Sequence, residues 1–115
     1  MKPKVSIVIP TYNHLSDALR PCLESIVKFT DLSSTEVIVV SNGSTDGTQD
    51  FVRALGEPFK LLDHPEPIGY PKAVNAGIRE ATGEYVVLLN NDTALLDQQA
   101  NTWIDMMLQP FEDPE

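Results

Sequence analysis

The sequence predicts an α/β domain of Rossmann-like type, with a mainly parallel sheet and helices on both faces. Short β-branched runs alternate with segments of helical spacing in the order β-α-β-α-β-α-β-α, and such alternation indicates parallel strands joined by crossover helices. The strand-like runs are almost continuously apolar, as expected where helices cover both faces of a sheet. Because the chain has 115 residues and is 42% hydrophobic, we expect a single domain with a core of its own.

Four short apolar runs are predicted as strands. They are Val5–Ile9, Glu36–Val40, Phe59–Leu62 and Tyr85–Leu89, and the third is the weakest because it is short and carries a lysine. Pro10 is expected to end the first strand, since proline lacks the N–H that a sheet ladder needs.

Four segments show the apolar spacing of amphipathic helices. They are Leu15–Thr30, Thr48–Leu55, about Pro71–Ala81 and Asp97–Leu108. Prolines near a helix start are tolerated because the first N–H groups have no intrahelical partner. The last helix places Trp103, Ile104 and Met107 on one side, which we expect to be exposed or buried in a homodimer.

Three polar clusters follow the first, second and fourth predicted strands. They are Thr11-Tyr12-Asn13, Asn42-Gly43-Ser44 and Asn90-Asn91-Asp92. The carboxyl ends of parallel strands meet at one edge of a sheet, and ligands of such folds bind there. The sequence therefore predicts a polar site built from these three loops.

Asp92 is the candidate metal ligand, since a carboxylate at the end of a buried strand suits Mg²⁺ or Mn²⁺. Its alternative role is to cap the next helix or turn.

Asn42 and Ser44 are candidates for holding a base or ribose, with an ordinary glycine-containing turn as the alternative. An amide both donates and accepts hydrogen bonds, so Asn42 predicts broad tolerance of pyrimidine bases.

Two further sets of residues are candidates for ligand binding, and each also has an ordinary structural explanation. Tyr12 is placed to stack on a base and Thr11 to bond to it, or they form a strand end covered by a half-buried tyrosine. Lys72 and Asn75 begin the third helix, where a lysine and a helix N-terminus suit an anionic ligand. A solvated surface lysine is the alternative.

Charge and composition narrow the class of ligand. The formal net charge is −9 and no basic cluster is present, which argues against binding of DNA or RNA. An acidic chain that holds a phosphorylated ligand needs a divalent cation to neutralise it. A single cysteine, Cys22, predicted to lie in the core, and the lack of a signal peptide or transmembrane-length run lead us to expect a cytoplasmic protein.

Three stretches together resemble glycosyltransferase family 2, a group of inverting enzymes with the GT-A fold. They are VSIVIPTYNH (Val5 to His14), EVIVVSNGSTDGT (Glu36 to Thr48) and IGYPKAVNAGIREATGEYVVLLNNDT (Ile68 to Thr93). The resemblance covers nearly the whole chain in the right order. It implies the N-terminal, nucleotide-sugar-binding portion of such an enzyme, active in polysaccharide biosynthesis.

The resemblance also implies roles for individual residues. Thr11 and Tyr12 would lie near the nucleobase and Asn42 would face it. Asp92 would bind the metal at the diphosphate, with Asn91 beside it. Many family members carry Asp at the positions of Ser41 or Asn42 and of Asn90 or Asn91, so this site has fewer charges. The nucleotide-sugar-binding set is Thr11, Tyr12, Asn13, Asn42, Ser44, Lys72, Asn75 and Asn91.

The expected reaction is transfer of a sugar from a UDP- or dTDP-sugar to a glycan or lipid-linked acceptor, with Mg²⁺ or Mn²⁺. The family's general base comes from a later segment, and nothing after Asp92 matches it, so the base is expected beyond Glu115 and residues 1–115 alone are expected to be inactive. The longer protein would then work at the inner face of the membrane.

Alternatives are a non-catalytic sugar-nucleotide-binding module and a sugar nucleotidyltransferase, although the latter needs a basic Gly-rich loop after the first strand. A receiver-like or flavodoxin-like domain is disfavoured because a receiver needs an acidic pair there.

Overall fold

The fold is a four-stranded parallel sheet in the order β3-β2-β1-β4. The computed structural model describes residues 3–95, 100 and 102–112. The strands are β1 (Val5–Thr11), β2 (Thr35–Asn42), β3 (Phe59–His64) and β4 (Tyr85–Leu88). All four predicted strands are present, and the predicted fold class is confirmed.

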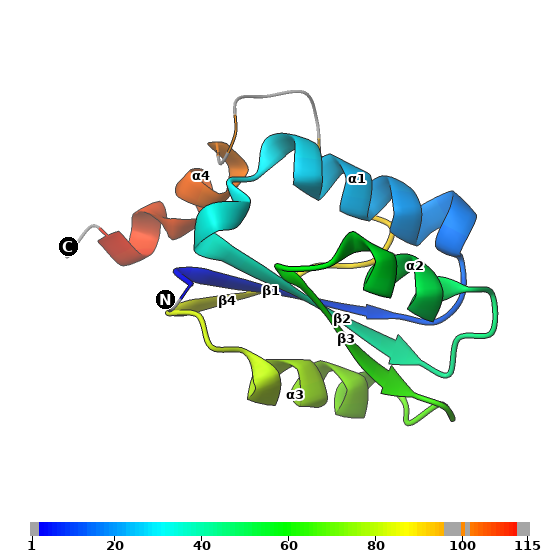
Figure 1. Ribbon diagram of the computed structural model, residues 1–115. Coiled ribbons are helices and arrows are strands. Elements are labelled where there is room, and N and C mark those ends of the chain that lie inside the picture. The colour runs from blue at the N-terminus through cyan, green and yellow to red at the C-terminus, as the bar shows by residue number, and fades with distance from the viewer. Residues whose placement is uncertain (1–2, 96–99, 101, 113–115) are drawn as a thin grey trace.

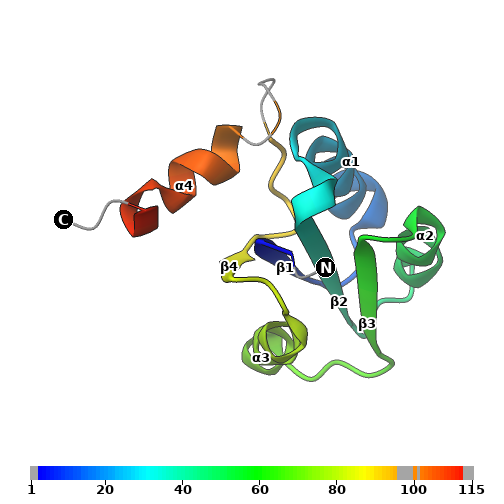
Figure 2. The same ribbon diagram turned by 60° about the vertical axis from the view of Figure 1, so that its left-hand side comes forward.

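Helices cover both faces of the sheet (Figure 1). α1 (Arg20–Phe29) and α2 (Thr48–Leu55) lie on one face and α3 (Tyr70–Glu80) on the other, an arrangement that the rotated view also shows (Figure 2). The remaining helical elements are a π-helical turn over Leu15–Leu19, a 3-10 turn over Leu32–Ser34 and α4 (Thr102–Glu112). None of the helices in the described ranges is both long and apolar enough to span a membrane.

The core has two parts because side chains alternate between the faces of a strand. On the α1 side, Ile7, Ile9 and Val39 pack with Leu23 and Ile26 of α1. On the α3 side, a smaller cluster joins Val8, Ile38 and Val40 to Ala73. Both faces of β1 and β2 are therefore buried, which explains their continuously apolar sequences.

The prediction that Pro10 ends the first strand is wrong, because β1 runs to Thr11 and Pro10 pairs with Val40. The backbone carbonyl of Val8 accepts a hydrogen bond from Leu89 N at 2.9 Å. The backbone N–H and C=O groups of Val8 therefore point toward β4, and by alternation the backbone nitrogen of Pro10 points the same way. The ladder with β4 ends at the Val8–Leu88 pair. No residue of β4 remains opposite Pro10 to accept a hydrogen bond. A proline, which lacks the N–H, is therefore tolerated at this position of the strand.

Two predicted helices have different bounds in the structure. The segment predicted as one helix from Leu15 begins with the π-helical turn, and Pro21 lies at the start of α1. The last helix begins at Thr102 rather than Asp97, and Asp97 itself lies outside the described residues. Thr48–Leu55 is confirmed as predicted, and α3 is shifted by one residue.

The expectation for the apolar side of the last helix is wrong for two of its three residues. Ile104 is 2% exposed and packs in the main core, and Trp103 packs against the same cluster. The indole N–H of Trp103 donates to Thr30 Oγ1 at 3.0 Å. Met107 remains half exposed. One side of the helix therefore packs on the chain's own core beside α1, while Met106 and Met107 stay exposed.

Candidate nucleotide-sugar site

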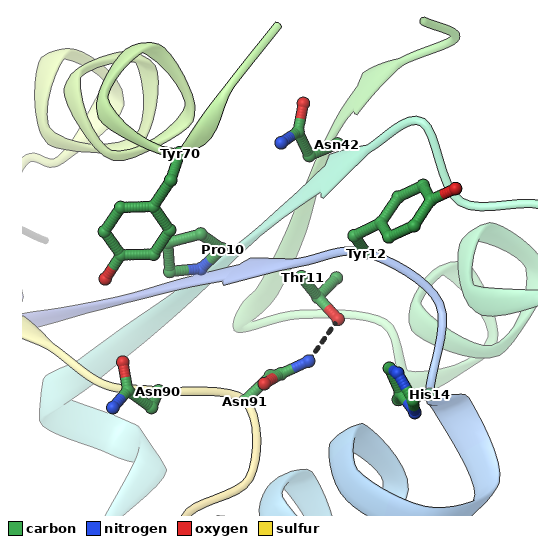
Figure 3. Close-up of a pocket in the computed structure, with 8 residues that line it drawn as sticks. All are labelled: Pro10, Thr11, Tyr12, His14, Asn42, Tyr70, Asn90 and Asn91. Atoms are coloured by element: carbon green, nitrogen blue, oxygen red, sulfur yellow. Dashed lines mark hydrogen bonds between the residues drawn. The ribbon is translucent and has the colours of Figure 1, made fainter. Parts of the chain in front are cut away.

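A pocket of ≈ 250 Å³ lies at the carboxyl edge of the sheet. The chain steps from β1 outward to β2 and β3 and then returns to add β4 on the other side of β1. Such a reversal of strand order opens a crevice between the loops that leave the two strands. The residues lining the pocket come from the end of β1 and the loop after it, the end of β2, the start of α3 and the loop after β4 (Figure 3): Pro10, Thr11, Tyr12, His14, Asn42, Tyr70, Asn90 and Asn91.

Thr11 links the ends of β1 and β4. Its Oγ1 accepts a hydrogen bond from Asn91 Nδ2 at 3.0 Å, drawn in Figure 3, and donates a longer one to the carbonyl of Asn13 at 3.4 Å. Thr11 is 3% exposed, whereas the neighbouring Tyr12 is 53% exposed. The buried threonine thus lies at the base of the pocket, and the exposed tyrosine ring is accessible to a ligand.

The loops after β1 and β2 are joined by a set of hydrogen bonds that we call the loop clamp. Asn13 N donates to Ser44 Oγ at 2.9 Å, and Asn13 Oδ1 accepts from Thr45 N at 2.7 Å. Leu15 N donates to Asp46 Oδ2 at 2.8 Å. Asn13 has φ 57°, a left-handed conformation that asparagine adopts more readily than most residues. The clamp fixes the backbone from which Tyr12 and Asn42 project.

Asp46 is the charged member of the clamp. Its other oxygen accepts from Thr48 Oγ1 at 2.6 Å and Thr48 N at 3.3 Å, at the start of α2. Partial burial raises the pKa of Asp46, but the bonds from Thr48 and Leu15 outweigh it and leave the pKa below its usual value. These donors favour the ionised carboxylate, so Asp46 is charged at neutral pH.

Asn42 lies at the end of β2 and is held by the segment that enters α3. Its Oδ1 accepts a hydrogen bond from Ile68 N at 2.7 Å. Gly43 N donates to the carbonyl of His64 at 2.9 Å, which ties the same loop to the end of β3. The start of α3 is thereby brought to the pocket, and Tyr70, its first residue, lines it.

Asp92 lies in an exposed turn after β4, next to the pocket residue Asn91. Burial, and secondarily the negative charge of Asp92, raise the pKa of the Cys22 thiol to about 11. Cys22 is fully buried, as predicted. Within the described ranges no three His, Cys, Asp or Glu side chains cluster as a metal site would. Asp92 and neighbouring carboxamide oxygens are hard ligands that suit Mg²⁺ or Mn²⁺ when phosphate and water complete the shell.

The structure divides the predicted site residues into three groups. Thr11, Tyr12, Asn42 and Asn91 line the pocket together. Asn13 and Ser44 belong to the loop clamp, and Ser44 is 6% exposed. Lys72, Asn75 and Asp92 are exposed and lie outside the lining of the pocket.

Sequence reasoning missed three residues that line the pocket, Pro10, His14 and Tyr70, and it predicted Asn90 as a member of its polar cluster without giving it a role. Tyr70 had a usable pattern, since an aromatic residue between Gly69 and Pro71 opens a helix that starts at this edge of the sheet. The ring of His14 is exposed and lies 3.2 Å from the carboxylate of Asp17.

Residues 6–115 match the family model described as Glycosyl transferase family 2. The chain belongs to this family. Among curated relatives, it is 33% identical over 108 residues to the uncharacterized glycosyltransferase YibD of Escherichia coli, covering 92% of this chain and 31% of YibD. It is 32% identical over 115 residues to the O-antigen biosynthesis protein RfbC of Myxococcus xanthus, covering 98% of this chain and 9% of RfbC.

Solved structures of glycosyltransferases share the fold. The mannosyltransferase PcManGT of Pyrobaculum calidifontis, solved with GDP-Man and Mn²⁺, has a TM-score of 0.80 and 31% identity, over 99% of this chain and 34% of that one. TarS 1-349 of S. aureus, solved with UDP-GlcNAc, has a TM-score of 0.78 and 27% identity, over 95% and 31%. This family 2 chain thus shares the GT-A fold and spans about a third of the length of each of these two solved structures.

Proposed function

We propose that this chain binds the nucleotide-diphosphate end of an activated sugar and supplies the donor side of a glycosyl transfer to an acceptor hydroxyl. The observation that carries the proposal is the pocket at the strand-order reversal. It combines two exposed tyrosine rings with the carboxamides of Asn42, Asn90 and Asn91. Aromatic faces suit a base, and amides suit the hydroxyl and carbonyl groups of a nucleoside. Related structures solved with GDP-Man and UDP-GlcNAc support this class of ligand.

In this proposal Asp92 holds a divalent cation, Mg²⁺ or Mn²⁺, beside Asn91. The cation supplies charge neutralisation for the diphosphate leaving group. The chain carries a net charge of −9, so a diphosphate without a cation is repelled by Asp92 and by the protein as a whole. The solved complex of PcManGT with Mn²⁺ supports the metal assignment.

Transfer with inversion requires a carboxylate to take the proton of the attacking acceptor hydroxyl. The eight residues that line the pocket include no carboxylate. We therefore assign donor binding to this part of the chain and the general base to another segment. The same lining favours a second candidate function, a sugar-nucleotide-binding module that does not catalyse transfer by itself.

Calorimetry with a nucleoside diphosphate tests the proposed function. UDP, dTDP and GDP are titrated in Mg²⁺ and in EDTA, into the parent chain and into Asp92→Ala. We expect at least one nucleotide to bind in Mg²⁺, and the affinity to fall by roughly 10-fold or more in EDTA or in Asp92→Ala, since a charged contact contributes about 1.5–3 kcal/mol.

Asp105→Ala is the matched control, because Asp105 is an exposed carboxylate of α4 and its loss changes the net charge by the same amount. It should bind as the parent does. Equal affinity with and without metal, or an unchanged affinity in Asp92→Ala, would refute the assignment.

A further inference from the structure

The carboxamide of Asn42 is fixed in one of its two possible orientations. Its Oδ1 lies 2.7 Å from Ile68 N. A backbone N–H can only donate, so the atom facing it must be the carboxamide oxygen. Rotating the amide by half a turn would place two donors against each other and lose this partly buried hydrogen bond.

The Ile68 N–H cannot easily move away from Asn42. Gly43 has φ +83°, and a Cβ at Gly43 would lie 2.7 Å from Cγ and Cδ of Pro67, so the segment before Ile68 packs directly on the Gly43 backbone. Gly43 N is bonded to the His64 carbonyl. The Ile68 side chain packs against the buried cluster on the α3 face. Three contacts therefore keep the N–H donor in place beside Oδ1.

The free group of the carboxamide is then Nδ2. In Figure 3 the nitrogen of Asn42 lies on the side of Tyr70 and Pro10, while the oxygen points away from them. Within the described part of the chain, Nδ2 has no hydrogen-bond partner. Tyr12 and Tyr70, both 53% exposed, line the same pocket. The structure thus presents an unpaired donor between two aromatic side chains.

We infer that this chain reads the nucleobase with a hydrogen-bond donor, the Nδ2 of Asn42, and selects bases that offer an acceptor at the contacted atom. The inference rests on the proposed function. It replaces the broad pyrimidine tolerance expected from the sequence, because the acceptor half of the amide is already used by Ile68. A base N–H at the contacted position is left unpaired and is selected against.

Uridine and cytidine diphosphates distinguish donor from acceptor readout, because their bases have the same shape. Uracil carries an N–H at position 3 and a carbonyl oxygen at position 4, whereas cytosine carries a lone pair and an amino group there. Because the carbonyl oxygen at position 2 is common to both bases, a selective contact must lie at position 3 or 4. At either of these positions a fixed donor favours one of the two bases, and a fixed acceptor favours the other.

Asn42→Asp is the variant that converts the donor into an acceptor. One carboxylate oxygen still accepts from Ile68 N, and the other takes the place of Nδ2 with little change in volume. Titrations of UDP and CDP with Mg²⁺ at pH 7 give the ratio of the two Kd values. We expect the ratio to change by about 10-fold or more and to cross one, so that the preferred pyrimidine is reversed. The added negative charge weakens both nucleotides alike and cancels in the ratio.

Two controls accompany this measurement. Gln109→Glu makes the same amide-to-carboxylate change at an exposed position of α4 and should leave the ratio unchanged. Asn42→Ala removes both groups and should bring the ratio toward one. Binding of both nucleotides with the same preference in Asn42→Asp and in the parent chain would overturn this inference alone. Binding of no nucleotide to the parent chain would overturn the proposed function together with it.

Discussion

At the scale of single residues, the carboxylate of Asp46 makes the contacts that position the pocket. One oxygen accepts from Leu15 N and the other from Thr48, so the residue holds the chain after β1 against the start of α2. Asp46 does not line the pocket, yet the backbone it fixes carries both Tyr12 and Asn42. We therefore regard it as a positioning residue.

Asp46→Ala should lower the free energy of unfolding by about 1–2 kcal/mol, the usual cost of losing a capping side chain. The same variant should also weaken nucleotide binding, because the loops that carry the pocket residues are no longer joined. Urea unfolding and calorimetry measure the two effects. Asp50→Ala, which removes a 94%-exposed carboxylate of α2, should change neither by more than about 0.5 kcal/mol. A stable, fully binding Asp46→Ala would contradict the positioning role.

The sequence predicted which polar residues gather at this edge better than it predicted what each of them does. Thr11, Tyr12, Asn42 and Asn91 meet in the pocket as expected. The partners of Asn13 and Asn42 lie 31 and 26 residues away along the chain. Which hydrogen bond a side chain makes across such a separation depends on packing, so the loop clamp and the orientation of the Asn42 amide were out of reach of local patterns.

At the scale of elements, a buried carboxylate joins three strands and a loop at the opposite end of the sheet. Glu36 of β2 accepts hydrogen bonds from Ser6 of β1, Lys60 of β3 and Thr82 in the loop between α3 and β4. Its side chain is 5% exposed. Burial raises the pKa of Glu36, but the bonds from Lys60, Ser6 and Thr82 outweigh it and lower the pKa to about 2.

The stability of the domain should therefore depend on pH through Glu36. Because the pKa of Glu36 is lower in the folded than in the unfolded chain, its contribution is fully present above about pH 5 and is lost as the pH falls from about 5 to about 2. Glu36→Gln should cost about 2–4 kcal/mol at pH 7 and should flatten this part of the pH profile. Urea unfolding at pH 7 and pH 3 gives both values.

Glu24, an exposed residue of α1, is the matched control for this change. Glu24→Gln should shift the unfolding free energy by less than about 1 kcal/mol at either pH. A profile in Glu36→Gln as steep as that of the parent chain would show that Glu36 does not carry the dependence.

The elements themselves were largely predictable because pattern and packing agree. The apolar runs of β1 and β2 are buried on both faces, and the apolar side of α2 is as its spacing predicts. The exceptions have tertiary causes. Pro10 is accepted in β1 because β4 has already ended there, and Ile104 of α4 is buried by the core beside α1 rather than by a partner.

At the scale of the whole molecule, the two ends of the sheet carry different sets of polar residues. The amino-terminal end carries the hydrogen bonds of the buried Glu36 carboxylate. The carboxyl-terminal end carries the pocket, the exposed tyrosines and Asp92. Since the chain spans about a third of YibD and of PcManGT, our proposal gives it the donor-binding part of the reaction alone.

An NMR titration of the ¹⁵N-labelled chain with a nucleoside diphosphate and Mg²⁺ tests the central claim most directly, because it locates the ligand residue by residue. We predict saturable shifts of the amide signals around Tyr12, Asn42, Tyr70 and Asn91, including the side-chain amide of Asn42. Signals of Glu36 and its hydrogen-bond donors should stay in place. Saturable shifts centred on Glu36, or none at the pocket at millimolar nucleotide, would contradict the assignment of the carboxyl edge as the nucleotide-sugar site.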